Sequence, residues 1–132
     1  MPIHQTYLRP GLLYEKWDGP IEPNELYANN QRFVEQVQQE NLPLNIVIVE
    51  VLPGAKIPLM SVLVNVSKKF PKGKVQYLVV SKSTFHKQVS IMLTRLVSVP
   101  LTVCPDAQTA VELANKLLDA IPPSQPLDKP KF

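Results

Sequence analysis

Four consecutive β-branched residues, Ile46-Val47-Ile48-Val49, restrict the fold of this chain more than any other feature of its sequence. A continuous run of this kind is typical of a strand that is covered on both faces, because a strand with one face in water alternates apolar and polar residues. The run lies inside a predicted strand over 44–52, and Pro53-Gly54 ends that strand. We therefore expect a sheet whose central strand is buried on both sides.

Three other segments have the pattern of strands. Residues 75–80 and 101–104 are short apolar runs rich in β-branched side chains. Residues 7–17 predict a hairpin, or one strand with a bend, around Pro10-Gly11. Proline fixes φ and glycine accepts positive φ, so this dipeptide suits the two central positions of a type II turn.

Four stretches have apolar residues at helical spacing. One starts near Pro23 and stops near Asn41, and the others start near Pro58, Ser83 and Asp106. Strands that alternate with helices pair in parallel through right-handed crossovers. The sequence thus predicts a single α/β domain over 1–121, with a mixed or mostly parallel sheet of four to five strands and about four helices. The Pro-rich segment 122–132 is expected to be a disordered tail.

The net charge of +3 is unevenly distributed. Residues 1–50 sum to −4, residues 51–105 to +8 and residues 106–132 to −1. Four lysines of the middle segment form one cluster: Lys68, Lys69, Lys72 and Lys74. Such a cluster predicts docking to a polyanion, although lysine is also common at a solvated helix end. Arg95 is the only arginine of this segment, and the scarcity of arginine disfavours nucleic acid as the partner.

The remaining composition favours a cytoplasmic protein without metal or cofactor. Cys104 is the only cysteine, so no intramolecular disulfide can form, and the N-terminus lacks the pattern of a signal peptide. No apolar run reaches the roughly 20 residues of a membrane-spanning helix. Cys104, His86 and Asp106 include the residue types of a thiol-nucleophile site, but a core cysteine and a helix cap explain two of them, so no catalytic residue is assigned. With His4 as the only other histidine, metal-ligand spacing is also missing.

One candidate ligand site combines residues that follow different strands. Lys82, Ser83 and Thr84 follow one predicted strand and open a helix, whereas Lys56 follows another. The carboxyl ends of parallel strands meet at one edge of a sheet, where helix N-termini and lysines favour an anion. The simpler interpretation of Ser83 is that it caps a helix.

Trp17 is a candidate for contact with a protein partner, because tryptophan is enriched in interface hot spots. The alternative is a half-buried aromatic residue on an edge strand. An edge strand would itself offer unpaired backbone groups for dimer formation or for extension of the sheet.

The order of these elements resembles the STAS-like α/β fold of sporulation-type anti-sigma-factor antagonists and their bacterial relatives. Residues 13–20, 46–54 and 101–120 carry the resemblance, which covers roughly 7–121 and rests on patterns of apolar and turn residues. Members of that family have an Asp-Ser-Ser-Gly-like turn whose serine is phosphorylated. Here the corresponding region offers only Ser61, without an acidic neighbour or a following glycine, so the phosphorylation switch does not carry over.

The resemblance implies a non-enzymatic regulatory or protein-interaction module in the cytoplasm, bound to a protein partner or to itself as a homodimer. Two alternatives remain open at this point. One is an anion-binding or catalytic domain that uses the loops at the carboxyl ends of the strands. The other is electrostatic docking through residues 68–74.

Overall fold

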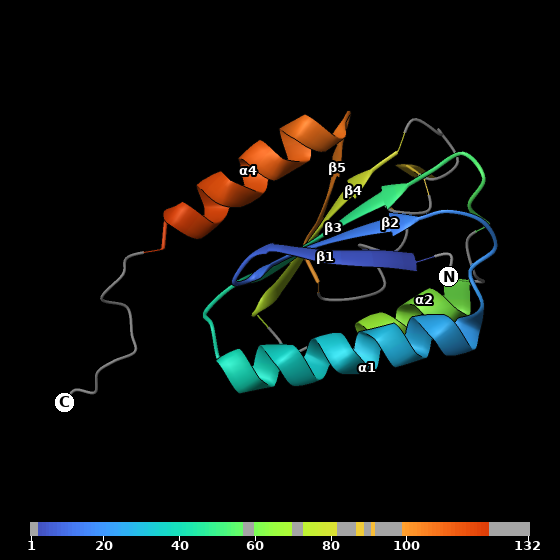
Figure 1. Ribbon diagram of the computed structural model, residues 1–132, viewed down its shortest axis with the longest axis horizontal. Helices are drawn as coiled ribbons and strands as arrows, with labels where there is room; N and C mark the ends of the chain where they lie inside the picture. Colours follow the sequence, from blue (N-terminus) through green and yellow to red (C-terminus); the bar gives the residue numbers. More distant parts are fainter. Residues whose placement is uncertain are drawn as a thin grey trace.

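The computed structural model describes residues 3–56, 60–69, 73–81, 87–88, 91 and 99–121. They form one sheet in which five strands lie side by side in the order of the chain (Figure 1). The first two strands are antiparallel, and the second to fifth are parallel to one another. The strands are β1 (Ile3–Arg9), β2 (Leu12–Trp17), β3 (Asn45–Val51), β4 (Val75–Val80) and β5 (Leu101–Cys104). The predicted α/β class with a mixed, mostly parallel sheet is confirmed.

Helices cover both faces of this sheet (Figure 1). α1 (Pro23–Glu40) and α2 (Met60–Ser67) contact each other on one face, and α4 (Ala107–Asp119) lies on the opposite face, against β3, β4 and β5. Because α1 and α2 each connect neighbouring parallel strands, the right-handed crossover rule places both on the same side. α4 follows the last strand and is free of that rule, so it can cover the other face.

Alternate residues of the strands build two apolar layers, as the pleat of a sheet requires. The layer facing α1 and α2 contains Leu13, Trp17, Val47, Val49, Val51, Val75 and Val79. The layer facing α4 contains Leu12, Ile46, Ile48, Leu78, Val80 and Cys104. β3 contributes to both layers, which confirms the expectation of a central strand buried on both sides.

Both ends of α1 and the start of α4 follow the predicted signals. Pro23 opens α1, and Asn41 ends it in the left-handed conformation, with φ of 50° and its N–H donating to the Val37 carbonyl at 3.0 Å. Asp106 caps α4, because its Oδ1 accepts from the Thr109 N–H at 2.7 Å.

The helix predicted to start near Ser83 falls mostly outside the described residues. Of that stretch, the structure describes Lys87, Gln88 and Ile91, and all three are helical. The predicted tail over 122–132 lies wholly outside the described residues. Within the described ranges, none of the helices combines the length and the apolar character that crossing a membrane requires.

Candidate functional site

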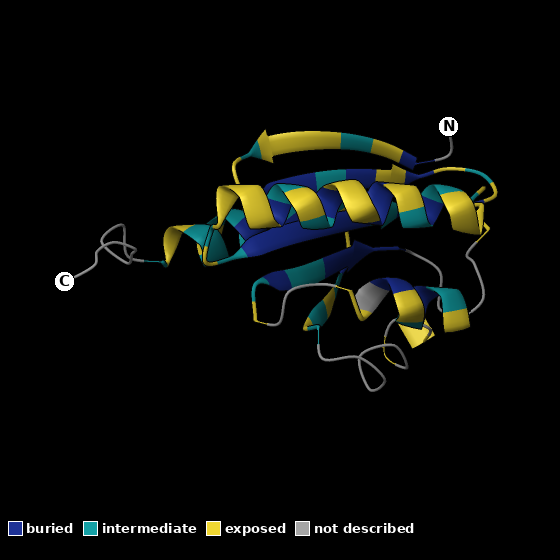
Figure 2. Cartoon of the chain, turned by 90° about the horizontal axis from the view of Figure 1, so that it is seen from below, coloured by how far each residue is buried: buried dark blue, intermediate teal, exposed yellow. Residues whose placement is uncertain are grey.

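β1 is an edge of the sheet, and it is the more exposed of the two edges. In the described part of the chain it pairs with β2 alone, so its outer side faces no strand. Tyr7 and Leu8 of β1 are each 48% exposed. Figure 2 shows this outer strand largely exposed beside inner strands that are buried. The opposite edge, β5, has only four residues, and a short edge strand offers little backbone to a partner.

The turn and an irregularity in β1 divide its side chains between the two faces. Gly11 has a φ of +84°, the positive value that the second central position of a type II turn needs. The register shifts between Tyr7 and Arg9, so that Tyr7 pairs with Leu13 and Arg9 with Leu12. Leu13 faces α1 and Leu12 faces α4, and cross-strand partners share a face. Tyr7 therefore belongs to the α1 face and Arg9 to the α4 face.

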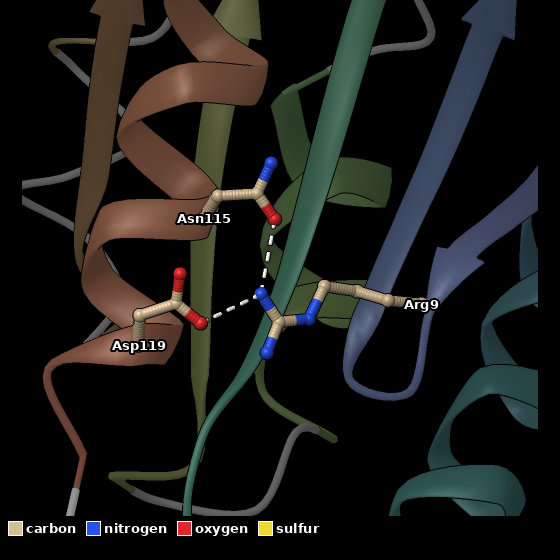
Figure 3. Close-up of polar contacts among 3 residues, drawn as sticks. All are labelled: Arg9, Asn115 and Asp119. Carbon is tan, nitrogen blue, oxygen red and sulfur yellow. Dashed lines mark hydrogen bonds and ion pairs between the residues drawn. The ribbon is translucent and has the colours of Figure 1, made fainter.

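Arg9 attaches the hairpin to the last helix (Figure 3). Its Nη1 donates to Asn115 Oδ1 at 3.1 Å and to Asp119 Oδ1 at 2.9 Å, and both acceptors belong to α4. The guanidinium group therefore binds two side chains of α4 in the same chain.

A shallow groove of about 370 Å³ lies between the end of β1 and the last turns of α1. It is lined by Tyr7, Arg9, Pro10, Gln36 and Glu40. Gln36 Nε2 donates to Glu40 Oε2 at 2.8 Å, a contact between residues one helical turn apart. The lining combines a phenol, an amide and a carboxylate beside an exposed edge strand, and such a combination can receive a polar side chain.

A buried carboxyl group lies on the same face, under α1. Glu15 of β2 is 8% exposed, and its two oxygens accept hydrogen bonds from Gln5 Nε2 at 2.8 Å and from Trp17 Nε1 at 3.0 Å. Burial raises the pKa of Glu15, while the two hydrogen bonds oppose that shift because they favour the charged form. The net direction is upward, so desolvation outweighs the two donors.

Two tyrosines are electrostatically coupled to this carboxyl group. Burial raises the pKa of the Tyr7 phenol, and the carboxylates of Glu40 and Glu15 raise it further. Burial also raises the pKa of Tyr77, with a smaller effect from Glu15. Tyr7, which lines the groove, is therefore within range of the charge of Glu15. Sequence reasoning missed Glu15, although alternation in β2 places it on the same face as Leu13 and Trp17, where a glutamate is out of pattern.

Trp17 does not offer the surface that contact with a partner requires. It is 8% exposed, and its indole N–H is bonded to Glu15. The expected position on an edge strand is also wrong, because β1 covers the outer side of β2. The edge exists, but residues that precede Trp17 form it.

The predicted anion crevice requires parallel strands whose carboxyl ends lie together, and this requirement is met. Most of its predicted ligands lie outside the described residues. β3, β4 and β5 are parallel, and Glu50, Val80 and Cys104 lie level at their carboxyl ends. Lys56, which follows the carboxyl end of β3, is exposed, and its backbone N–H donates to the Gly19 carbonyl at 3.0 Å. The other predicted ligands, Lys82, Ser83 and Thr84, are not among the described residues, so an anion site here stays a prediction.

The basic cluster is anchored at two separate points of α1. Lys69 lies with its Nζ 5.7 Å from the centre of the Tyr27 ring, and Lys74 Nζ donates to Asn41 Oδ1 at 3.1 Å. Tyr27 and Asn41 are about 21 Å apart along the helix, at 1.5 Å per residue. Lys68 is exposed and Lys72 lies outside the described residues. The described lysines are therefore spread along the surface instead of converging on one point, and polyanion docking stays a prediction.

The remaining sequence candidates are single residues. Ser61 is exposed in the first turn of α2, and its phosphorylation stays a prediction. Cys104 is buried, and burial followed by the charge of Asp106 raises the pKa of its thiol, the opposite of what a nucleophilic cysteine needs. His86 is not among the described residues. Within the part of the chain that the structure describes, no three potential ligands are grouped around a metal position.

Comparisons with known proteins do not assign this chain to a family. No protein-family model matches the chain, and no curated protein matches its sequence.

Proposed function

We propose that this protein is a non-enzymatic, cytoplasmic, STAS-like module that binds another polypeptide by extending its sheet at β1. The observation that carries the proposal is the exposed edge: the seven residues of β1 have no strand on their outer side in the described structure, and Tyr7 and Leu8 are half exposed on it. A strand that adds to such an edge gains main-chain hydrogen bonds, and its alternate side chains supply specificity.

β1 has little protection against pairing with a strand of another chain. Natural edges that avoid pairing are short or bulged, or carry inward-pointing charges, lysines or prolines. The irregularity of β1, between Tyr7 and Arg9, lies near its end and leaves residues 3–7 in regular register with β2. Within β1 the charged side chain is Arg9, and it is bonded to α4. The regulatory part of the proposal rests on the STAS-like order of elements, and the order β1, β2, α1, β3, α2, β4, β5, α4 is compatible with it.

The test is to place charges on β1 and to compare this variant with a control that carries two lysine substitutions elsewhere on the surface. In the variant Thr6→Lys/Leu8→Lys, both replaced side chains are exposed on β1 and neither lines the groove. The matched control, Thr102→Lys/Ile91→Lys, replaces an exposed threonine of β5 and another exposed large hydrophobic residue. Circular dichroism and thermal unfolding first establish that both variants are folded.

Sedimentation velocity and crosslinking in source-cell extract then measure association with a second copy and with other proteins. We expect the β1 variant to lose the association that the wild type and the control retain. Equal association of all three proteins would overturn the proposal, and so would the absence of any associated chain for the folded wild type. Loss in the control alone would overturn the proposal as well.

A further inference from the structure

We propose that the strand which pairs with β1 belongs to a different protein and inserts a lysine or arginine side chain into the groove lined by Tyr7, Gln36 and Glu40. This inference depends on the proposed function, because it assigns a chemistry to the strand that β1 binds. It follows from the position of the groove, from its charge, and from the side chains that a second copy would bring.

The position of the groove matches the path of an added strand. Tyr7 lies on the α1 face of the edge strand, and Gln36 and Glu40 approach that face from the last turns of α1. A strand added outside β1 would run about 4.8 Å away from it, and every second side chain would point to the α1 face. Those side chains would point to the side of the sheet on which the groove lies.

The charge of the groove favours a cation. Glu40 is at the C-terminal end of α1, where the helix dipole is negative, and the last turn of α1 contains no basic residue. Among the described residues, the one donor to the Glu40 carboxylate is the neutral amide of Gln36. The basic residue of the lining, Arg9, is paired with Asp119 at 2.9 Å. The groove therefore offers a carboxylate, and the Tyr7 ring beside it can also attract an ammonium or guanidinium group.

A second copy of this chain does not supply such a side chain. In an antiparallel pair of β1 strands within one continuous sheet, the residues of each copy stay on their own face. The α1 face of β1 carries Ile3, Gln5 and Tyr7, because these residues pair with Trp17, Glu15 and Leu13. None of the three is basic, and His4 pairs with Lys16, on the other face. A second copy that pairs antiparallel through its own β1 thus cannot fill the groove, and we assign the occupant to a basic extended segment of another protein.

The test uses two acetylated heptapeptides of alternating threonine and valine that differ only in a central lysine or glutamate. The full-length protein is titrated with each peptide and followed by its backbone amide resonances. Glu40→Gln removes the charge of the groove. Glu35→Gln is the matched control, because Glu35 is on the same helix, is exposed, and accepts from Gln31 one turn earlier, as Glu40 does from Gln36.

We expect the wild type and Glu35→Gln to bind the lysine peptide about fivefold more tightly than the glutamate peptide, the preference that one partly exposed ion pair supplies. Glu40→Gln should bind both peptides with affinities within about twofold of each other. A lysine preference that survives Glu40→Gln, or that Glu35→Gln abolishes equally, would overturn the inference.

The same titration separates this inference from the proposed function. If both peptides bind the wild type equally and Thr6→Lys/Leu8→Lys binds neither, strand addition at β1 stands and the basic side chain is wrong. If the folded wild type binds neither peptide at millimolar concentration, pairing of a separate strand with β1 fails, and the basic side chain fails with it.

Discussion

Arg9 Nη1 lies 2.9 Å from Asp119 Oδ1 and joins the first strand to the last helix across 110 positions of the sequence. Asn115 Oδ1 accepts from the same nitrogen, so the end of β1 is fixed to α4 on one face while its other face borders the groove. The two side chains of the ion pair are 37% and 66% exposed, which means that water and salt screen their attraction.

Asp119→Asn should lower the free energy of unfolding only slightly, by less than about 1 kcal/mol, because exposed ion pairs contribute little. The measurement is urea unfolding at low salt and at about 1 M salt, where the difference from the wild type should disappear. Glu112→Gln, an exposed carboxylate on the same helix that accepts from Gln108, is the control for the loss of one negative charge. A loss above about 2 kcal/mol at both salt concentrations would contradict a screened pair.

Glu15 predicts a decrease in stability as the pH rises. Burial raises the pKa of Glu15 in the folded protein above its ordinary value of 4.5, so the folded state retains this proton more strongly than the unfolded state does. The stabilisation is complete below the ordinary value, and it is lost as the pH rises through the raised pKa. Thermal unfolding from about pH 5 to about pH 8 should show this loss in the wild type.

Glu15→Gln should show a smaller change across the same pH range, because glutamine does not titrate and its carbonyl can still accept from Gln5 or from Trp17. Glu35→Gln, at an exposed position, should behave like the wild type. A pH dependence that persists in full in Glu15→Gln would show that another group causes it.

The two layers of the core predict a large difference between apolar residues of similar size. Leu78 is 1% exposed in the layer that faces α4, whereas Ile91 is 53% exposed. Leu78→Ala should lower the free energy of unfolding by about 2–5 kcal/mol through lost burial and a residual cavity. Ile91→Ala should change it by less than about 0.5 kcal/mol. Urea unfolding of the two variants checks this, and similar losses would mean that Leu78 is not in a packed core.

The elements that are held by burial could be predicted from the sequence. The β-branched run at 46–49 predicted a central strand, and β3 is buried on both faces. The helix signals at Pro23, Asn41 and Asp106 also correspond to helix ends in the structure. In each case a local pattern and the tertiary environment favour the same conformation, so the prediction needed no long-range information.

The candidate site was not predictable in the same way. β1 contains His4, Gln5 and Thr6, and it is held by backbone pairing with β2 more than by burial, so its side chains leave little trace of a strand beyond Tyr7. The hairpin was predicted only from residue 7 onward, whereas β1 begins at Ile3, which pairs with Trp17 and covers its outer side. The face that α4 chooses, and hence the contact of Arg9 with Asp119, depends on packing after the last crossover and has no local signal. The groove arises where these unpredicted contacts meet.

Gly11 and Gly73 offer a controlled test of the turn that holds the edge strand. Both glycines have positive φ, +84° and +75°, so alanine is strained at either position. At Gly11 a Cβ atom would also lie 3.1 Å from the backbone oxygen of Leu44, which cannot rotate away, whereas at Gly73 it would meet nothing within 4 Å. Gly73→Ala should cost about 1–2 kcal/mol of the free energy of unfolding, the cost of positive φ alone.

Gly11→Ala should cost at least about 1 kcal/mol more than Gly73→Ala, because the close contact adds to the same backbone strain. The excess should also appear locally, as faster hydrogen exchange of the amides of β1 in Gly11→Ala than in Gly73→Ala. Because the turn positions the strand that we propose as the binding edge, Gly11→Ala should weaken binding of the lysine peptide as well. Equal stability of the two variants would mean that the hairpin can move away from Leu44, and that the groove is less rigid than its contacts imply.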